Sequence, residues 1–356
     1  MSNKIYFTPG PAQLFYTFEE HLKKALFHDI PSISHRSADF IKVVQETTES
    51  LRELLELPDG YNIYFLNSAN EAWDRIVQNL VDNSSHHFAN GAFSQKFYDF
   101  AREHRKSSTL TRVNDGAKFT EWNVPDGAEL IGVTKNETSV GYSFLEEELE
   151  NLRNRYPKKL IALDVVSATP SLPINFKNVD TAYFSTQKAF GMPSGLGVWI
   201  VNERCHEVAL ERAKLVSLGS YRALPNLKKF GDKYQTPETP NMLYIYILGR
   251  VVKDILQAGV QRMRNDTTYK AAILNQMIET HPYLDHFVES KEHRSKTTIV
   301  AKSSMSREIL NFFQKKGLIL GSGYGVHKEN HIRIANFPTH SKESIEMLSD
   351  MMEKIK

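Results

Sequence analysis

The sequence predicts an α/β protein with a mainly parallel sheet, on the strength of three observations. Short β-branched or aromatic runs alternate with amphipathic helical patterns along most of the chain, as they do in βα units. The chain has 356 residues, enough for about two domains of roughly 150 residues each. Its residues are 41% hydrophobic and 24% charged, so we expect a sizeable buried core.

The first two thirds of the chain contain the patterns for the main sheet. Apolar residues recur at helical spacing over 37–57, and the breakers at 58–60 then end that helix. Further helices are expected to begin near Asn70 and near Ser94, and over 145–156, where apolar residues share one face. The expected strands are short apolar runs at 63–66, 130–133, 159–163, 181–184 and 196–201.

After about Asn241 the pattern changes to one typical of a smaller α+β domain. A long helical stretch over 242–256 and 260–279 has no glycine-rich linker, and the domain boundary is expected in or beside it. The elements expected beyond it are strands at 297–301, 318–320 and 331–336, a helix over 306–316, and a last helix after Ser341.

Composition excludes several classes of protein. The 44 basic and 42 acidic residues leave a net charge of +2, so the basic surface of a nucleic-acid-binding protein is missing. The longest apolar runs, such as 196–201 and 242–248, are far shorter than the roughly 18 residues of a membrane span. Cys205 is alone, which excludes an intrachain disulfide or a multi-cysteine metal site. We expect a cytoplasmic protein with no metal, no nucleic-acid partner and no membrane partner.

Lys188 is the first candidate for chemistry. It follows the predicted strand 181–184 and lies close to Phe190 and to turn residues at 191–195. A lysine in such a place is most often a solvated surface residue. If apolar neighbours partly desolvate its ammonium group, the pKa falls and the free amine can form a Schiff base.

Asp164 favours the interpretation of Lys188 as a Schiff-base lysine. It lies at the carboxyl end of the predicted strand 159–163, and carboxyl ends of strands in an α/β sheet face the ligand crevice. A pyridoxal phosphate enzyme needs such a pair: the lysine bonds to the cofactor, and the aspartate keeps the pyridine nitrogen protonated. Taken alone, Asp164 is equally typical of a turn or a helix N-cap.

With these residues in place, the chain resembles the class V aminotransferase group of fold-type I pyridoxal phosphate enzymes. The resemblance runs from the segment 7–12 to the segment 333–338 and includes Ser185-Thr186-Gln187-Lys188 and Asp164. It implies a large domain at 1–245, with an N-terminal arm and a mainly parallel sheet of the seven-stranded type flanked by helices. A smaller α+β domain follows at 246–356.

The resemblance also implies a set of residues that bind pyridoxal 5′-phosphate. Backbone groups of Ala69 and Asn70 would hold the phosphate at a helix N-terminus, although the usual glycine-rich turn is absent from 67–71 and Asn70 alone is a common N-cap. The remaining expected cofactor contacts are the ring of Phe93, stacked on the pyridine, Thr138 at its oxygen substituent, Gln187 at the phosphate, and Gln235 and Thr236 from the other subunit. The last pair implies a homodimer with shared active sites. Without the resemblance, these are ordinary core and turn residues.

The implied substrates are anionic amino acids and oxo acids. Arg333 would clamp the α-carboxylate through a bidentate contact, and the candidates for the second anionic group are His35, Arg36, His327 and Lys328. For each of these side chains, a solvated surface charge is the alternative. The activity implied is transamination between glutamate and 3-phosphohydroxypyruvate, giving phosphoserine and 2-oxoglutarate in serine biosynthesis.

Two other functions stay open at this point. Alanine–glyoxylate or serine–pyruvate exchange would use the same lysine, aspartate and arginine. A non-catalytic α/β binding module is the alternative from another class, but the chain has no Gly-x-Gly-x-x-Gly after its first strand and no phosphate loop ending in Gly-Lys-Ser/Thr. Cysteine desulfuration is disfavoured, because Cys205 follows Lys188 by only 17 residues (205 − 188).

Overall fold

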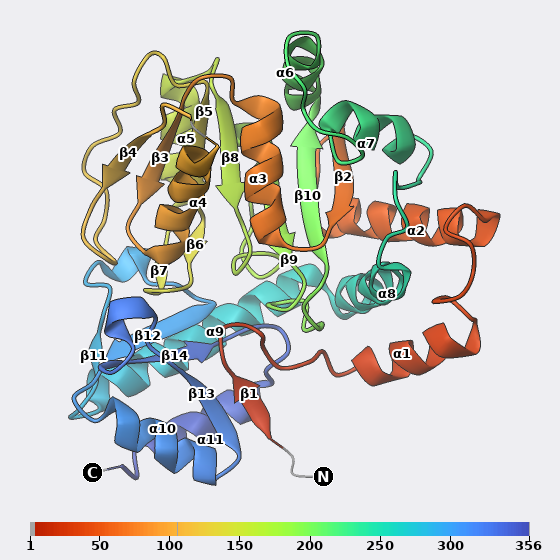
Figure 1. Ribbon diagram of the computed structural model, residues 1–356. Coiled ribbons are helices and arrows are strands. Elements are labelled where there is room, and N and C mark those ends of the chain that lie inside the picture. Colours follow the sequence, from red (N-terminus) through yellow and green to blue (C-terminus); the bar gives the residue numbers. More distant parts are fainter. Residues whose placement is uncertain (1–3, 105, 356) are drawn as a thin grey trace.

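A computed structural model describes residues 4–104 and 106–355 of the chain. Over these residues, two main sheets are present, a seven-stranded one and a five-stranded one (Figure 1). No helix in this part of the chain combines the length and the apolar character that crossing a membrane requires. The α/β class and the mainly parallel large sheet are confirmed.

The seven-stranded sheet has the order β2-β10-β9-β8-β5-β3-β4. Its strands are β2 (Tyr61–Leu66), β3 (Ser85–Ala89), β4 (Thr109–Arg112), β5 (Leu130–Thr134), β8 (Leu160–Asp164), β9 (Thr181–Ser185) and β10 (Gly197–Asn202). The pairs from β4 through β9 are parallel, whereas β10 runs antiparallel to both of its neighbours. The carboxyl ends of β8 and β9 therefore lie side by side at one edge of the sheet.

Helices cover both faces of this sheet because its strands are apolar on both sides. Within β8, Ile161 and Leu163 belong to one hydrophobic core and Leu160 and Ala162 to the other. The first core includes residues of α2 (Ala38–Leu54), α5 (Glu146–Arg155) and α8 (Met242–Ala258). The second includes residues of α3 (Ala69–Leu80), α4 (Ala92–Glu103), α6 (Glu203–Ala213) and α7 (Leu224–Gly231). Alternation along each strand thus builds a layer of helices on either face.

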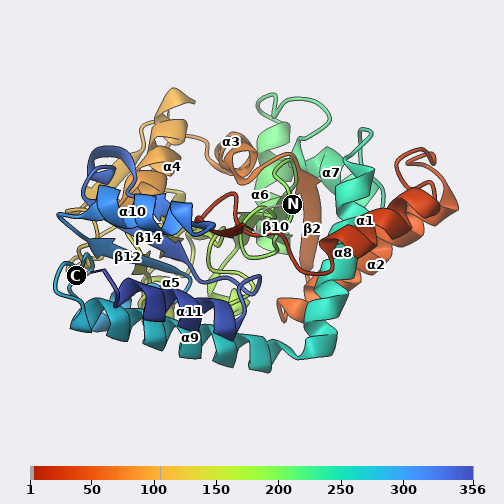
Figure 2. The ribbon, with the colours of Figure 1, turned by 90° about the horizontal axis from the view of Figure 1, so that it is seen from below.

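The five-stranded sheet has the order β1-β13-β14-β12-β11 and belongs mainly to the C-terminal third of the chain. Its strands are β1 (Ile5–Phe7), β11 (Asp285–His286), β12 (Thr298–Lys302), β13 (Leu318–Ser322) and β14 (His331–Ala335). Its core includes side chains of α9 (Val260–Thr280), α10 (Ser306–Lys315) and α11 (Lys342–Met352). Figure 2 shows α9 running along this sheet with α11 beside it. The division into 1–245 and 246–356 stays a prediction.

The N-terminal strand was not expected from the sequence. β1 is only three residues long, and it pairs in parallel with β13, so that Phe7 lies opposite Leu320. The next helix, α1 (Phe18–Phe27), lies beside α8 (Figure 1). The N-terminal segment therefore belongs to the five-stranded sheet first and reaches the large sheet's helices afterwards.

Helix boundaries follow local signals. The side chain of Ser37 accepts a hydrogen bond from the N–H of Phe40, which fixes the start of α2. That helix ends at Leu54, three residues earlier than expected, because the chain turns at Glu56, which has a φ of 53°. The helices and the hairpin not anticipated from the sequence are α1, α6, α7 and the pair β6 (Asn136–Glu137) and β7 (Tyr142–Ser143).

Candidate active site

Lys188 lies three residues beyond β9, at the carboxyl end of that strand. Its Nζ donates a hydrogen bond to the carbonyl oxygen of Pro9 at 2.5 Å and lies 5.7 Å from the centre of the Phe93 ring. Gly10 is so close that a Cβ atom built on it would lie 2.4 Å from this Nζ. The N-terminal segment therefore covers the amine, and only a residue without a side chain fits at position 10.

The surroundings of Lys188 favour its neutral form. Burial and, to a smaller extent, the positive charge of Arg333 lower the pKa of the Lys188 amine, which is about 8 when all neighbouring groups act together. The carboxylates of Asp164 and Glu137 act in the opposite direction. Burial outweighs them, so an appreciable fraction of the amine is unprotonated near neutral pH and can act as a nucleophile or a base.

Asp164 is the last residue of β8, and it pairs in parallel register with Tyr183 of β9. Its Oδ1 accepts a hydrogen bond from the N–H of Val166 at 2.9 Å. Burial raises the pKa of Asp164 to about 7, because water is excluded from the carboxylate. A cation placed against this carboxyl would restore its charged form.

Two aromatic side chains support Asp164 from the α3 side of the sheet. The indole N–H of Trp73 donates to the hydroxyl of Tyr183 at 2.6 Å, and both side chains are buried. A hydrogen bond between Tyr183 and the Asp164 carboxyl lowers the pKa of that carboxyl, as does the positive charge of Lys188. These contacts only partly offset the effect of burial.

Phe93 and Thr138 are tied together by Glu137, which the sequence had not singled out. Phe93 is the second residue of α4, and its N–H donates to one carboxylate oxygen of Glu137 at 3.3 Å. The N–H of Ser94 donates to the other oxygen at 2.8 Å. Thr138 follows Glu137 directly, and its hydroxyl donates to Ser167 at 2.7 Å. The start of α4 and the β6 turn are thus one unit beside Lys188.

Arg333 reaches the same place from β14. Its Nε donates to the carbonyl oxygen of Ser322 at 2.8 Å, and a terminal nitrogen donates to the carbonyl oxygen of Thr138 at 3.3 Å. Burial lowers the pKa of Arg333 to about 10. The guanidinium group therefore lies between the two sheets, on the Thr138 side of Lys188.

His327 and Lys328 do not share the contacts that Arg333 makes. The Nε2 of His327 lies 2.9 Å from an Asp115 oxygen, and its ring stacks on His331 with the centres 4.5 Å apart. Lys328 is exposed. Within residues 4–104 and 106–355, neither side chain hydrogen-bonds to Lys188 or Arg333.

The helix that follows the predicted phosphate-binding turn, α3, has a different N-cap residue from the one expected. Ser68 is the N-cap of α3, and its hydroxyl accepts from the N–H of Glu71 at 3.2 Å, so the assignment of that cap to Asn70 is wrong. The N–H of Ala69 donates to the Ser185 hydroxyl at 2.7 Å and so already has an acceptor. The N–H of Asn70 lies in the first helical turn, where intrahelical acceptors do not exist.

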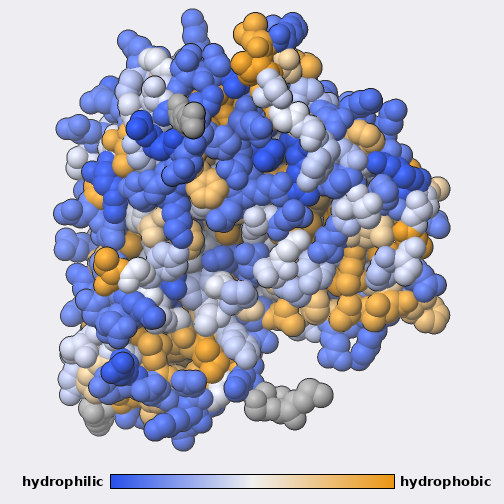
Figure 3. Space-filling model, in the orientation of Figure 1, coloured by the Kyte–Doolittle hydropathy of each residue, from blue (hydrophilic) through white to orange (hydrophobic). Residues whose placement is uncertain are grey.

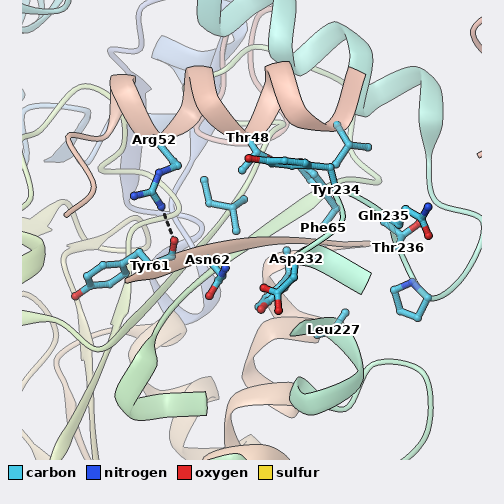
Figure 4. A pocket seen from close by; sticks show the side chains of 15 residues that line it. Thr48, Arg52, Tyr61, Asn62, Phe65, Leu227, Asp232, Tyr234, Gln235 and Thr236 are labelled. Atoms are coloured by element: carbon cyan, nitrogen blue, oxygen red, sulfur yellow. Dashed lines mark hydrogen bonds between the residues drawn. The ribbon is translucent and has the colours of Figure 1, made fainter. Parts of the chain in front are cut away.

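The four residues His35, Arg36, Gln235 and Thr236 form a separate cluster. A terminal nitrogen of Arg36 donates to the Gln235 side-chain oxygen at 3.2 Å and to the Thr236 carbonyl at 2.6 Å, and His35 lies 3.3 Å from Thr239. Gln235 and Thr236 also line a surface pocket of about 310 Å³ between α2, β2 and the 231–237 loop (Figure 4). In the described part of the chain, no hydrogen bond joins this cluster to Lys188.

Three further groups of the site carried no signal of their own in the sequence. Pro9 and Gly10 belong to a segment that showed only a family resemblance, and in the structure they cover Lys188. Tyr324 stands in a glycine-rich run, and its ring lies 5.1 Å from that of Phe93. Lys96 is one helical turn after Phe93, and its Nζ donates to the Tyr324 hydroxyl at 2.8 Å.

The residues present fit pyridoxal 5′-phosphate. Asp164 is a buried carboxyl at the end of β8, and a protonated pyridine nitrogen against it would stabilise its charged form. The side-chain oxygen of Gln187, next to Lys188, is buried without a hydrogen-bond partner among the described residues. Lys188 and Arg333 have no carboxylate within 4.0 Å in that part of the chain, so anionic groups of a ligand are their natural partners.

A largely buried lysine and a buried aspartate at adjacent strand ends of a mainly parallel sheet are the pair that a fold-type I pyridoxal phosphate enzyme requires. The model of the family Aminotransferase class-V matches residues 98–344. The crystal structure of a phosphoserine aminotransferase from Cytophaga hutchinsonii is 42% identical and covers 100% of both chains, with a TM-score of 0.98. The chain belongs to the class V aminotransferase family, and it is a transaminase that uses pyridoxal 5′-phosphate.

More distant relatives agree with this family. The phosphoserine aminotransferase of Rhodococcus jostii (strain RHA1) is 27% identical over 331 residues, which cover 90% of this chain and 87% of that protein. A phosphoserine aminotransferase from Trichomonas vaginalis, solved with pyridoxal phosphate bound, is 19% identical, and the match covers 99% of this chain and 100% of that one with a TM-score of 0.80. At that identity, the second likeness speaks for the fold alone.

Proposed function

We propose that the enzyme transfers an amino group between glutamate and 3-phosphohydroxypyruvate, giving 2-oxoglutarate and phosphoserine for serine biosynthesis. The observation that carries the proposal is Arg333, a mostly buried guanidinium group that donates to two carbonyl oxygens beside Lys188. A cation with no carboxylate partner among the described residues suits a substrate α-carboxylate. The relatives from Cytophaga hutchinsonii and Rhodococcus jostii, both called phosphoserine aminotransferases, support the choice of substrate.

The residues of this chain divide the work. When bound, pyridoxal 5′-phosphate supplies an electron sink for the carbanion that forms as the substrate loses its Cα proton. In our proposal the Lys188 amine takes that proton at its Nζ and returns it as a general acid, with Asp164 held as a carboxylate against the pyridine nitrogen. Arg333 orients the α-carboxylate.

The other cofactor contacts hold the ring and the phosphate. We assign Phe93 to stacking on the ring, Thr138 to its oxygen substituent, and Asn70 with Gln187 to the phosphate. The Ala69 N–H is not assigned to the phosphate, because it donates to the Ser185 hydroxyl. The segment that contains Pro9 and Gly10 covers the amine and keeps water away from it.

We further propose that the enzyme is a homodimer and that the cluster of His35, Arg36, Gln235 and Thr236 completes the site of the second copy. The cluster is built as a unit around the Arg36 guanidinium and yet stands apart from Lys188. Exposed apolar side chains on and next to α1 include Leu14, Tyr16, Leu26 and Phe27. Figure 3 shows hydrophobic side chains gathered on the side where α1, α2 and α8 lie, which suits contact with another copy.

Hybrid dimers test this assignment. Lys188→Ala and Arg36→Ala chains should each be nearly inactive as homodimers. Mixing them in equal amounts under exchange conditions restores one complete site in each hybrid, so about a quarter of the wild-type activity returns. If activity stays at the level of the separate variants while sedimentation shows hybrid dimers, Arg36 acts in its own chain's site and the shared-site proposal is wrong.

A donor and acceptor screen tests the reaction itself. We expect the highest kcat/KM with phosphoserine and glutamate as donors, and with their oxo acids as acceptors. Preference for alanine with glyoxylate, or for serine with pyruvate, would replace this proposal by the corresponding exchange.

We also place the enzyme in the cytoplasm, in keeping with its single free and buried cysteine. The two domains 1–245 and 246–356 remain part of the proposal. Cell fractionation and limited proteolysis, respectively, test these two points.

A further inference from the structure

Lys96 is a lysine next to Phe93 and Tyr324 to which the proposed reaction gives no role. It lies on α4, three residues after Phe93. Its Nζ is 5.5 Å from the centre of the Phe93 ring and 5.3 Å from that of the Tyr324 ring. It donates a hydrogen bond to the Tyr324 hydroxyl at 2.8 Å. The amine is therefore held beside two aromatic side chains, one of which, Phe93, is the ring that we expect to stack on the cofactor.

Tyr324 connects this lysine to the substrate clamp. It follows β13 of the five-stranded sheet, whereas Lys96 and Phe93 belong to a helix on the large sheet. The Arg333 guanidinium lies 5.4 Å from the centre of the same Tyr324 ring. Lys96 and Arg333 thus both lie within 5.5 Å of the centre of one tyrosine ring, and Phe93, which Lys96 contacts, is also a neighbour of Lys188.

The charge of Lys96 has no partner carboxylate in the described part of the chain. No carboxylate of the described residues lies within 4.0 Å of its Nζ, although the side chain is half-buried. Lys342, which also lies over an aromatic ring, that of Tyr269 at 5.4 Å, has Asp266 at 2.6 Å. A half-buried ammonium group without a counter-charge costs free energy that an anionic ligand can recover.

We infer that Lys96 is a specificity-determining residue that binds the substrate's second anionic group, the phosphate of phosphoserine or the γ-carboxylate of glutamate, while Tyr324 fixes the direction of its amine. The inference rests on the proposed function, because it presupposes a substrate with two anionic ends. Arg333 takes one end. Lys96, a second cation that is held at the hydroxyl of the same Tyr324, is then available for the far end, and the two-charge phosphate gains more from it than the carboxylate.

The test uses the holoenzyme of two variants. Lys96→Met keeps the apolar stem over the rings and removes the charge, whereas Lys96→Arg keeps the charge. For Lys96→Met we expect kcat/KM to fall about tenfold or more with phosphoserine, as for the loss of one charge-assisted hydrogen bond. The loss with glutamate should be smaller, and alanine, which lacks a second anion, should be used unchanged. Lys96→Arg should stay within about threefold for every donor.

Two controls separate this effect from damage to the fold or to the cofactor site. Lys342→Met removes a lysine from an aromatic ring elsewhere and should leave all three donors unaffected. Tyr324→Phe should reproduce part of the phosphoserine loss, because it removes only the hydroxyl that holds Lys96. The cofactor dissociation constant of Lys96→Met should equal that of the wild type.

The outcomes distinguish the inference from the reaction on which it rests. Equal losses for phosphoserine, glutamate and alanine in Lys96→Met, or weaker cofactor binding, would overturn the assignment to the far anion, and so would an unchanged donor preference. A wild-type enzyme that does not use phosphoserine would instead refute the proposed function, whatever the variants do.

Discussion

Glu137 accepts hydrogen bonds from both the N–H and the hydroxyl of Ser94, at 2.8 and 2.7 Å, at the first turn of α4. The Ser139 hydroxyl donates to the other carboxylate oxygen at 2.6 Å. The Glu137 side chain fills the place where a side chain of Gly91 would lie, with its Cγ 2.4 Å from a Cβ built there. The carboxylate thus locks the helix that carries Phe93 to the turn that carries Thr138.

Glu137→Gln should loosen this lock. Its amide presents N–H groups to donors that need acceptors, and we expect the protein to lose about 2–3 kcal/mol of stability and the cofactor to bind at least about tenfold more weakly. Equilibrium dialysis with pyridoxal phosphate and urea denaturation measure the two effects. Glu148→Gln is the matched control, because Glu148 accepts from the Leu145 N–H at the start of α5. That variant should lose stability and keep cofactor affinity; equal cofactor affinities in both variants would argue against a positioning role for Glu137.

Gly10→Ala should displace the Lys188 amine from its catalytic position. A Cβ atom at 2.4 Å from Lys188 Nζ forces the lysine or the N-terminal segment to move, and the φ of +143° disfavours any side chain there. We expect kcat to fall about 100-fold or more, as displaced catalytic groups usually cause. Gly60→Ala is the control, since Gly60 also has a positive φ, +83°, but meets no atom within 4 Å. Near wild-type turnover in Gly10→Ala would show that the segment does not press on Lys188.

Covalent capture of the cofactor by the apoenzyme should depend on pH through Lys188. Burial lowers the pKa of this amine to about 8, and only the unprotonated amine reacts, so the rate should rise as pH increases through about 8. Arg333→Met removes a positive charge that lowers this pKa, and the midpoint should move to higher pH. Stopped-flow absorbance of added pyridoxal phosphate follows the reaction, and Lys188→Ala should give none. A midpoint near the ordinary lysine value of 10.5 would contradict the role of burial.

Asp164→Asn should reveal the cost of the buried carboxylate in the apoenzyme. The folded pKa of Asp164 is raised from 3.8 to about 7, so the folded state keeps a proton that the unfolded chain releases. The contribution of Asp164 to the free energy of unfolding therefore falls as pH rises from about 4 to 7, and above about 7 it is constant. The difference in free energy of unfolding, variant minus wild type, should increase over that window. Urea denaturation at several pH values measures it, and a difference independent of pH would mean that Asp164 has an ordinary pKa. Transaminase activity should be lost.

Strand ends were the part of the site that the sequence predicted well. The runs around 159–163 and 181–184 form β8 and β9 within one residue at every boundary, because alternating apolar residues must face two helical layers. Parallel pairing of these strands then brings Asp164 and the loop of Lys188 to the same edge. Local patterns were sufficient here.

Contacts across long stretches of chain were beyond such patterns. Lys188 and the Pro9 carbonyl are 179 residues apart, and Lys96 and Tyr324 are 228 apart. Neither pair has a local periodicity that links its members. The three residues of β1 become a strand only because β13 pairs with them, and a run that short is ambiguous when taken alone.

The pairing of β1 with β13 also affects how the enzyme is made. The strand formed by residues 5–7 leaves the ribosome long before its partner at 318–320, and at about 5–20 residues per second the delay is about 15 to 60 s. During that interval the segment that will cover Lys188 has no sheet to hold it. A nascent chain can therefore fold its large sheet and expose the lysine, but the amine is sealed from solvent only when translation is almost complete.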